Sequence, residues 1–294
     1  MAEIVVGVDR SSHSADALRW AAGEARLLGA EVVAVLVWDL FNQHHADGEW
    51  RFDPHYDETH ADRALEAAVE DALGAEAARR VARRTPCDLP APGLLGAAKG
   101  ADLLVVGARG AGGFPGLQLG SVSQQVLHHA LCPVAIVRSA VGPDDGPEGG
   151  RVLVGVDGSP SSRTALRWAL AEGGRRGATV DVLHAWEVPA IVGPAPGGYP
   201  YDTEALDQAA HALVDTLVDE ATAEAPGVTV ERHVVGGGPA AGLLEAAQDA
   251  TLIVVGRRGL GGFRRLLLGS VSDHVARHAP CPVVVMPPGE EDDA

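Results

Sequence analysis

Short apolar runs alternate along this chain with longer segments in which apolar residues recur every three or four positions. In the second half, the apolar runs lie at Arg151–Val156, Thr179–Trp186, Val228–Val235, Leu252–Gly256 and Pro282–Met286. Runs of this length predict strands, and their continuous apolar character favours burial on both faces of a parallel sheet. The segments between them have the period of helices, which we expect to reach Arg176 and to cover Thr203–Ala223, Pro239–Gln248 and Ser270–His278.

The regular alternation of strand and helix predicts an α/β fold, in which a doubly wound parallel sheet carries helices on both faces. The first half has the same order of elements, although its third strand, at Val81–Pro86, is rich in arginine. Each half therefore predicts a five-stranded sheet. We expect the strand order 3-2-1-4-5, a Rossmann-like arrangement that opens a crevice between the first and fourth strands.

The two halves are related by an internal repeat of domain length. Val6-Gly-Val-Asp9 recurs as Val154-Gly-Val-Asp157, and Cys132-Pro-Val134 recurs as Cys281-Pro-Val283. A period of this size indicates tandem domains, because solenoid and propeller repeats are far shorter. We therefore expect one domain at residues 1–139 and a second at residues 151–290. The segment 140–150 between them has no apolar periodicity and predicts a linker.

A glycine-rich motif occurs once in each half, directly after the fourth apolar run. Gly107, Gly110, Gly120 and Ser121 form the first copy, and Gly256, Gly259, Gly269 and Ser270 form the second. Glycine is costly to order, so its repetition indicates backbone that approaches a ligand closely or adopts positive φ. Each copy leads into a helical pattern, and the free N–H groups and dipole of a helix start attract anions. The sequence thus predicts two phosphate-binding sites.

An aspartate follows the first strand in each half, at Asp9 and Asp157. If the first and fourth strands are neighbours, each aspartate faces its glycine-rich loop across the crevice. A carboxylate there can hold ribose hydroxyls or a metal ion such as Mg2+. The alternative is that Asp9 and Asp157 only cap the following helix, a role for which Ser11 and Ser159 are rivals.

Charge and composition narrow the class of ligand. The net charge of −17 argues against long nucleic acids as partners, whereas arginines such as Arg109 and Arg258 beside the glycine-rich loops suit a small anion. No apolar run approaches the length of a membrane span, and the amino-terminal residues lack a signal-peptide pattern. The three cysteines include no Cys-x-x-Cys pair, so we expect a cytoplasmic protein without disulfides.

The chain contains a single lysine, Lys99, which has no counterpart in the second half. A Walker-A loop requires lysine before its serine or threonine, and both loops here end in Leu-Gly-Ser instead. Schiff-base chemistry is equally disfavoured, because it too requires a lysine at each site. The predicted phosphate sites must therefore rely on backbone N–H groups and arginine.

The combination of motifs resembles the universal stress protein family. The spacing Gly-x2-Gly-x9-Gly-Ser, an aspartate after the first strand and Cys-Pro-Val before the last all occur twice and in the same order. The resemblance covers essentially residues 1–290 and is closest to the tandem, actinobacterial type. It implies the fold predicted above, of the HUP type, and it implies ATP as the ligand.

The resemblance also assigns roles to individual positions. It implies that Asp9 and Asp157 contact ribose or Mg2+, and that the backbone at Val37 and Ala185 contacts the adenine edge. Besides the glycines and serines of the two motifs, the implied phosphate contacts are the backbone of Val122 and Val271 and the hydroxyls of Ser123 and Ser272. The two hydroxyls have an equal alternative as ordinary helix-start residues. Arg10 departs from the pattern, since glycine, Gly158, occupies the matching position of the second half.

These observations predict a nucleotide-dependent regulator or sensor in the stress response. The alternative is a slow ATPase, or an ATP-cleaving adenylating enzyme of the same broader fold group, although the His-x-Gly-His signature of such enzymes is absent from the sequence. We expect no fast catalysis and assign no catalytic residue. Apolar edge strands at Val134–Val137 and Pro282–Met286 predict pairing of the two domains and a homodimer through edge strands. The histidines between His44 and His60 fit a solvated loop better than a metal site.

Overall fold

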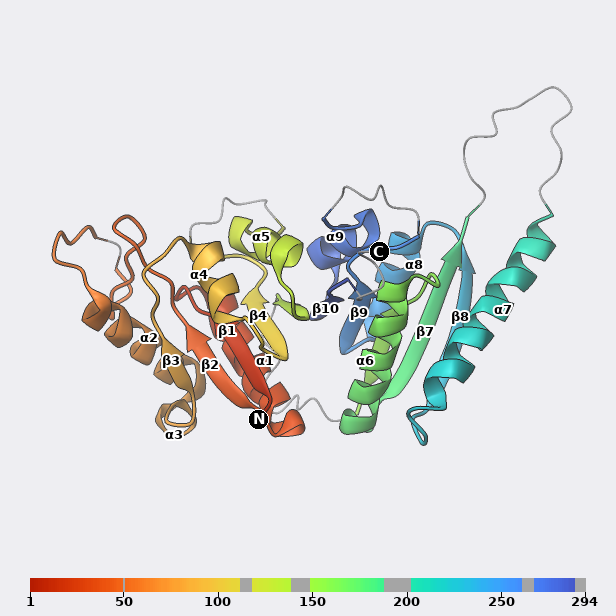
Figure 1. Ribbon diagram of the computed structural model, residues 1–294, viewed down its shortest axis with the longest axis horizontal. Helices are drawn as coiled ribbons and strands as arrows, with labels where there is room; N and C mark the ends of the chain where they lie inside the picture. Colours follow the sequence, from red (N-terminus) through yellow and green to blue (C-terminus); the bar gives the residue numbers. More distant parts are fainter. Residues whose placement is uncertain (50, 112–117, 139–148, 188–201, 261–266, 289–294) are drawn as a thin grey trace, which may run out of the picture. The chain divides into compact units, whose positions relative to one another are not determined.

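The computed structural model describes residues 1–49, 51–111, 118–138, 149–187, 202–260 and 267–288. The chain divides into two compact units, the first of Met1–Glu148 with Ala276–Pro287 and the second of Gly149–Val275 with Pro288–Ala294. Each unit consists of a sheet with helices packed against it (Figure 1). The predicted α/β class is therefore confirmed.

The first unit contains the elements expected from the first half of the sequence. Its strands are β1 (Glu3–Gly7), β2 (Glu31–Val35), β3 (Ala82–Arg84), β4 (Leu103–Gly107) and β5 (Val134–Val137). Its helices are α1 (Ser12–Leu28), α2 (Glu58–Leu73), α3 (Ala75–Ala78), α4 (Pro90–Ala97) and α5 (Ser121–His129). The strands run parallel in the order β3-β2-β1-β4-β5, which confirms the predicted order 3-2-1-4-5. The arginine-rich third strand is present but short.

The second unit repeats this arrangement. Its strands are β6 (Arg151–Gly155), β7 (Thr179–Trp186), β8 (Val230–Gly236) and β9 (Leu252–Gly256). Its helices are α6 (Pro160–Arg176), α7 (Thr203–Thr222), α8 (Pro239–Ala246), the 3-10 turn η1 (Ala247–Asp249) and α9 (Ser270–His278), of which the last three residues cluster with the first unit. The parallel order β8-β7-β6-β9 corresponds to 3-2-1-4 of the first unit.

The last strand of the chain pairs with the fifth strand of the first half. β10 (Val283–Met286) clusters with the first unit, where it pairs antiparallel with β5 and sets Val284 opposite Ala135. Both strands are buried and consist of apolar residues only. Bare apolar edges expose unpaired N–H and C=O groups, so the pairing of β5 with β10 satisfies both edges at once. The prediction that these two strands pair is confirmed.

The central strands are fully buried because helices cover both of their faces. Ile4, Val5 and Val6 of β1 and Leu104 and Val105 of β4 have no exposed surface. In the first unit α1 packs on α2 and α4 packs on α5, so that the sheet lies between the two pairs (Figure 1). Burial on both faces explains why these strands are continuous apolar runs rather than alternating ones.

The helix that follows the first strand of each unit has the same start and stop signals. α1 begins after the N-cap Ser11 and ends at Gly29, whose φ of 61° is left-handed. α6 begins after the N-cap Ser159, with Pro160 in its first turn, and ends at Gly177 with a φ of 63°. Serine caps the first N–H groups, and glycine adopts the left-handed stop without steric cost.

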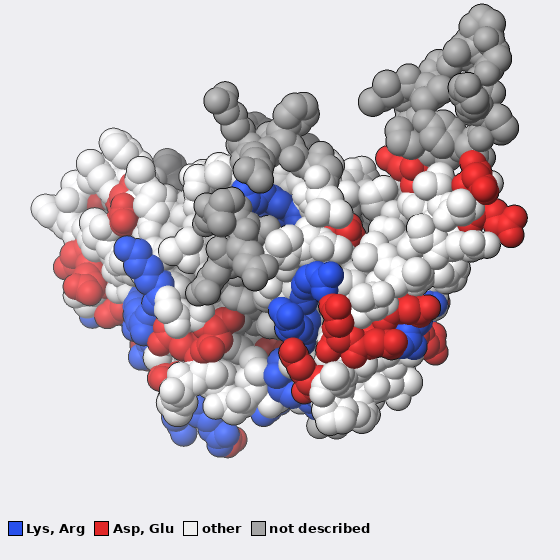
Figure 2. Space-filling model, turned by 45° about the vertical axis from the view of Figure 1, so that its right-hand side comes forward, with Lys and Arg blue, Asp and Glu red and all other residues white. Residues whose placement is uncertain are grey.

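The surface carries both signs of charge close together. On the face drawn in Figure 2, acidic and basic side chains stand side by side over the described residues. Charged side chains of the described residues form ion pairs, such as Arg163 with Glu220 and Arg84 with Glu3. Among the described residues, none of the helices is both long enough and apolar enough to span a bilayer.

Candidate functional site

Asp9 connects the end of β1 to the glycine-rich loop that follows β4. Its Oδ1 accepts hydrogen bonds from the backbone N–H of Ser11, at 3.0 Å, and from the Ser11 hydroxyl, at 2.6 Å. Its Oδ2 accepts a hydrogen bond from the backbone N–H of Ala111, at 2.9 Å. The carboxylate therefore holds the start of α1 and the glycine-rich loop together at the crevice between strands one and four.

Asp157 makes the same three contacts in the second unit. Its Oδ1 accepts from the Ser159 N–H at 3.0 Å and from the Ser159 hydroxyl at 2.6 Å, and its Oδ2 accepts from the Leu260 N–H at 2.8 Å. The prediction that each aspartate faces its glycine-rich loop is confirmed. The capping alternative is wrong, because the N-caps of the two helices are the serines.

The second glycine of each loop lies against this carboxylate. A Cβ atom at Gly110 would lie 2.5 Å from Asp9 Oδ2, and one at Gly259 would overlap Asp157 Oδ2. No real Cβ tolerates such an approach, so a side chain here would push the carboxylate away from the loop. These two glycines are thus required by the contact between the loop and the aspartate.

The first glycine of each loop is required by the packing of a strand against a helix. A Cβ atom at Gly107 would lie 2.7 Å from the backbone carbon of His13, at the start of α1. At Gly256 it would lie 2.8 Å from the backbone carbon of Ser161, at the start of α6. This close approach accounts for both glycines independently of any ligand.

The third glycine of each loop directly precedes the start of a helix. In the first unit, no side chain caps this helix start. Gly120 is the N-cap of α5, and its N–H donates to the carbonyl of Ala108 at 2.7 Å. Gly269 likewise donates to the carbonyl of Arg257 at 2.8 Å. The next backbone N–H groups belong to Ser121 and Val122, and to Ser270 and Val271 in the second unit. They are the groups through which a helix start attracts an anion.

Ser123 and Ser272 turn their hydroxyl protons toward the protein. The Ser123 hydroxyl donates to the carbonyl of Gly107 at 2.8 Å, and the Ser272 hydroxyl donates to the carbonyl of Gly256 at 2.6 Å. Both serines are buried. These bonds tie the helix start to the end of the preceding strand, which favours the structural alternative for both residues.

A cavity of about 490 Å³ opens beside Asp9 and the first glycine-rich loop. It lies at the carboxyl ends of β1, β2 and β4, where the strand order reverses and ligands bind in open α/β sheets. All of the predicted site residues of the first unit line it, namely Asp9, Val37, Gly107, Gly110, Gly120, Ser121, Val122 and Ser123. Sequence reasoning missed further lining residues, among them Asn42, His44, Pro90 and Leu94.

Val37 and Ala185 hold matching positions beyond the end of the first strand of each unit. The last pairing of β1 with β2 is Gly7 with Val35, and the last pairing of β6 with β7 is Gly155 with Leu183. Val37 and Ala185 both come two residues later. Their backbone on that side extends past the first strand toward the crevice. In the first unit, Asn42 Nδ2 donates to the Val37 carbonyl at 2.9 Å.

The histidine-rich segment of the first unit is packed at His44 and His45, whereas His55 is exposed to solvent, as the solvated-loop interpretation expects. The Tyr56 hydroxyl donates to the carbonyl of His44 at 2.5 Å, and the Tyr56 ring lies 5.4 Å from that of Trp38. His45 is buried, with its Nε2 3.0 Å from the carbonyl of Arg51. Aromatic packing thus holds this segment against the sheet and places His44 in the cavity wall.

The electrostatics of the cavity favour a neutral imidazole at His44. Burial lowers the pKa of His44, Arg10 and His45 lower it further, and the Asp9 carboxylate opposes them. Arg10 itself has a left-handed φ of 63°, where Gly158 of the second unit has 85°. Its Nη1 donates to the carbonyl of Ala64 at 2.9 Å. A non-glycine residue in this conformation is strained, and the bond to α2 helps to hold it.

The cysteines have the character of core residues. Cys132 and Cys281 are buried, and burial raises the pKa of the Cys281 thiol to about 12. The reactive form of cysteine is the thiolate, which such a pKa makes scarce at neutral pH. The cysteines of both Cys-Pro-Val segments thus belong to the core, whereas Cys87 is exposed.

Fold and loop geometry together define a class of protein. Two parallel α/β sheets each place an aspartate at the end of the first strand against a glycine-rich loop after the fourth. Comparison with known proteins agrees with that class. The family model described as universal stress protein family matches residues 1–138 and again residues 150–287. The chain therefore belongs to the universal stress protein family.

Individual relatives match over almost the whole chain. A universal stress protein of Mycolicibacterium smegmatis is 37% identical over 305 residues, which cover 97% of each chain. The universal stress protein Rv2623 of Mycobacterium tuberculosis is 34% identical over 292 residues, covering 96% of this chain and 95% of its own. The crystal structure of a universal stress protein from Archaeoglobus fulgidus superposes with a TM-score of 0.70 at 26% identity, covering 98% of both chains.

Proposed function

We propose that this universal stress protein binds ATP at both glycine-rich loops and acts as a nucleotide-dependent regulator or sensor in the stress response. The observation that carries the proposal is the duplicated contact between aspartate and loop, Asp9 with Ala111 and Asp157 with Leu260. A repeated site with the same hydrogen bonds in both units is expected where each unit binds the same ligand. The cavity beside the first loop has the volume of a small-molecule site.

The proposed contacts divide between the ends of three strands. The backbone at Val37, and at Ala185 in the second unit, would contact the adenine edge. The aspartates would face the ribose hydroxyls. The N–H groups around Gly120 and Gly269 would bind the phosphates, with Arg109 in the wall of the first cavity adding positive charge. This arrangement supplies anion-binding groups without the lysine of a Walker-A loop.

Ribose suits the aspartates better than direct coordination of Mg2+. Asp9 already accepts three hydrogen bonds, two at Oδ1 and one at Oδ2. A carboxylate offers about four lone-pair sites, so little of this one remains for a metal ion. Mg2+ would then reach the site with the phosphates of ATP and keep most of its water ligands.

The polar groups near the loops already make hydrogen bonds within the protein, which favours a regulatory role over fast catalysis. The carboxylates and the hydroxyls of Ser123 and Ser272 are engaged in holding the loop. The alternative remains slow ATP hydrolysis or adenylation. Steady-state turnover separates the classes: release of phosphate or pyrophosphate over minutes to hours fits a sensor, whereas turnover within seconds would show an enzyme.

We also propose that the protein is cytoplasmic. ATP is abundant in the cytoplasm, and an exposed thiol such as Cys87 stays reduced there. The proposal also includes a homodimer. Because β5 and β10 pair with each other, the dimer would use a surface other than these two edges. Light scattering at micromolar concentration tests the dimer.

The identity of the ligand is tested by denaturing the purified protein and analysing the released small molecules by mass spectrometry. The proposal expects an adenine nucleotide. A different nucleotide base, or a protein that releases none and takes up none from a mixture of ATP, GTP and CTP, would overturn it.

A further inference from the structure

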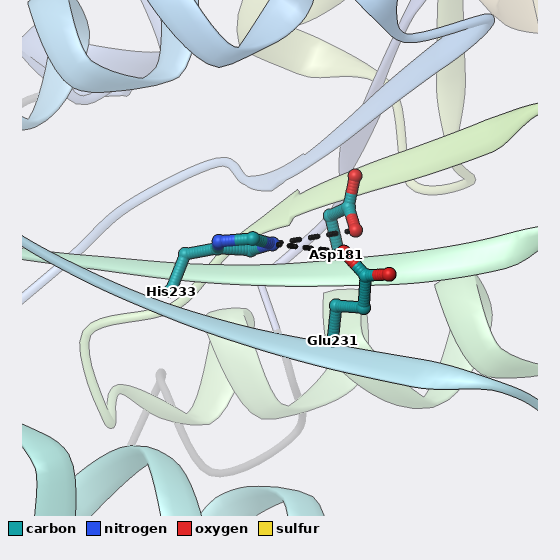
Figure 3. Close-up of side chains that lie close together, drawn as sticks. All are labelled: Asp181, Glu231 and His233. Atoms are coloured by element: carbon teal, nitrogen blue, oxygen red, sulfur yellow. Dashed lines mark hydrogen bonds and ion pairs between the residues drawn. The ribbon is translucent and has the colours of Figure 1, made fainter.

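Three side chains with metal-binding groups meet on the sheet of the second unit, away from the glycine-rich loop. His233 Nε2 lies 3.4 Å from Asp181 Oδ1 and 3.7 Å from Glu231 Oε2. The ligand atoms of all three residues lie within 4.8 Å of one another. Figure 3 shows the imidazole of His233 directed at both carboxylates. Among the described residues, no other set of three such groups is gathered this closely.

Strand register brings the three side chains together. Asp181 of β7 is paired with Glu231 of β8, and Leu183 is paired with His233. Alternate residues of a strand point to the same face, so Glu231 and His233 share the face that also carries Asp181. Ordered strands place the groups, so the cluster does not depend on a loop.

Arg151 donates a hydrogen bond to each of the two carboxylates. Its Nε donates to Asp181 Oδ2 at 2.6 Å and its Nη2 donates to Glu231 Oε2 at 3.0 Å. Asp181 Oδ1 faces His233 instead. For Asp181, this is the arrangement in which an outer partner orients a carboxylate ligand through one oxygen and leaves the other for an ion.

The cluster opens into a cavity of about 440 Å³ beneath α8. Arg151, Asp181 and His233 line one wall of this cavity, and Glu245 and Asp249 line it from the helix side. Asp181 is the most buried member, with 8% of its side chain exposed. With Glu231, four carboxylates and one arginine thus lie in or beside this cavity, and an excess of negative charge attracts a cation.

The first unit provides an internal comparison. By strand register, Val33 and Ala82 occupy the positions of Asp181 and Glu231, and Arg84 occupies that of His233. There Arg84 forms an ion pair with Glu3 at 2.9 Å, where the second unit has Arg151. In the first unit, an ordinary ion pair therefore occupies the place that the three-residue cluster has in the second unit. The additional acids and the imidazole belong to the second unit alone.

We propose that Asp181, Glu231 and His233 form a binding site for one divalent transition-metal ion of the Zn2+ type. Imidazole nitrogen and carboxylate oxygen are both ligands of Zn2+, whereas Mg2+ and Ca2+ take oxygen ligands almost alone. Three protein ligands leave a fourth position that faces the cavity, where water or a carboxylate of α8 can complete the coordination. The site is separate from the glycine-rich loop and does not rest on nucleotide binding.

Isothermal titration of the full-length, nucleotide-free protein with Zn2+ tests the proposal. The wild type is expected to bind one tight Zn2+ ion per chain. His233→Gln and Glu231→Gln each remove a ligand and should weaken this binding by more than about 100-fold, beyond the cost of losing an outer partner. Both side chains are partly exposed, so the variants should fold, which circular dichroism verifies.

The matched control is His211→Gln. His211 is an exposed histidine of the same unit whose Nε2 lies 3.6 Å from a carboxylate oxygen of Asp207, so it represents an ordinary pairing of histidine and aspartate. This variant should bind Zn2+ as the wild type does. Absence of a tight site in the wild type, or equal affinities of the folded His233→Gln and His211→Gln variants, would overturn the proposal and reduce the cluster to an ion-pair network.

Discussion

The backbone N–H of Ala111 donates a hydrogen bond to Asp9 Oδ2 at 2.9 Å, between residues 102 positions apart in the chain. The corresponding bond joins Leu260 to Asp157 at 2.8 Å across 103 positions. In each unit, one carboxylate at the end of the first strand thereby sets the position of the glycine-rich loop after the fourth. The position of the loop and the proposed contact with the ligand are consequently coupled through the same residue.

Asp9→Ala and Asp157→Ala should each abolish ATP binding in its own unit, because the loop loses its anchor and the ligand loses a polar contact. Calorimetric titration of each variant with ATP and Mg2+ measures the remaining sites. Asp215→Ala, which removes an exposed carboxylate of α7, is the control and should leave binding unchanged.

The two units are expected to differ in affinity. The left-handed backbone at Arg10 is strained, whereas glycine occupies the matching position of the second unit. We therefore predict that the second site binds at least as tightly as the first. The order would be reversed if Asp157→Ala left total binding untouched while Asp9→Ala removed it.

Gly120→Glu should abolish ATP binding in the first unit without unfolding it. A Cβ atom at Gly120 has its nearest neighbours at 3.5 Å, an ordinary contact, so the backbone tolerates a side chain. The glutamate carboxylate would then occupy and repel the phosphate position. Combining it with Gly269→Glu should remove both sites, as seen by titration with ATP.

Gly120→Ala is the matched control for this substitution, since it adds the Cβ atom without the charge. It should retain ATP binding and the wild-type circular dichroism spectrum. If Gly120→Glu is folded and still binds ATP at the first site, the phosphates lie elsewhere and the site assignments must be withdrawn.

Gly107→Ala should lower the free energy of unfolding by about 1–3 kcal/mol, the usual cost of overpacking. The added Cβ atom would press on the backbone of α1 at His13, which cannot yield as a side chain would. Gly96→Ala, in open space on α4, should instead be neutral or raise stability by up to about 1 kcal/mol. Urea midpoints of the two variants compare them, and equal midpoints would contradict the packing account.

The sequence predicted most of the fold because its signals are local and duplicated. Strand β7 has the predicted bounds Thr179–Trp186, and the arginine-rich β3 is present within the predicted Val81–Pro86. The sequence did not reveal that the last strand clusters with the first unit. The pairing of β10 with β5 joins segments far apart in the chain, and an apolar run alone does not predict which strand it will pair with.

The sequence predicted a candidate site from the residues that recur in both halves and missed cavity-lining residues that do not recur. Asp9 and Asp157 could be found from the repeat. His44 and Asn42 reach the cavity through the packing of Tyr56 on Trp38, which leaves no periodic pattern. The cluster of Asp181 with His233 depends on the register between two strands, which the order of residues alone does not reveal.

His44 should make stability depend on pH. Its pKa in the folded protein is lowered from the ordinary value by burial, so below about pH 6.5 the unfolded chain binds the proton more readily than the folded one. Stability contributed by the neutral imidazole is therefore lost as pH falls through that range. His44→Gln should lose less stability than the wild type between pH 7.5 and 5.5, measured by thermal unfolding.

His55→Gln is the control for this titration, because His55 is an exposed histidine of the same segment. It should follow the wild-type dependence on pH. A His44→Gln variant whose melting temperature falls on acidification as steeply as that of the wild type would show that the imidazole of His44 is not desolvated.

The central claim, that each unit binds ATP between its aspartate and its glycine-rich loop, is tested most directly by the binding stoichiometry of the full-length protein. Calorimetric titration of nucleotide-free protein with ATP in excess Mg2+ should give two sites per chain for the wild type. It should give none for the folded double variant Gly120→Glu with Gly269→Glu. Absence of binding to the wild type at saturating ATP, or two sites that persist in the double variant, would contradict the account.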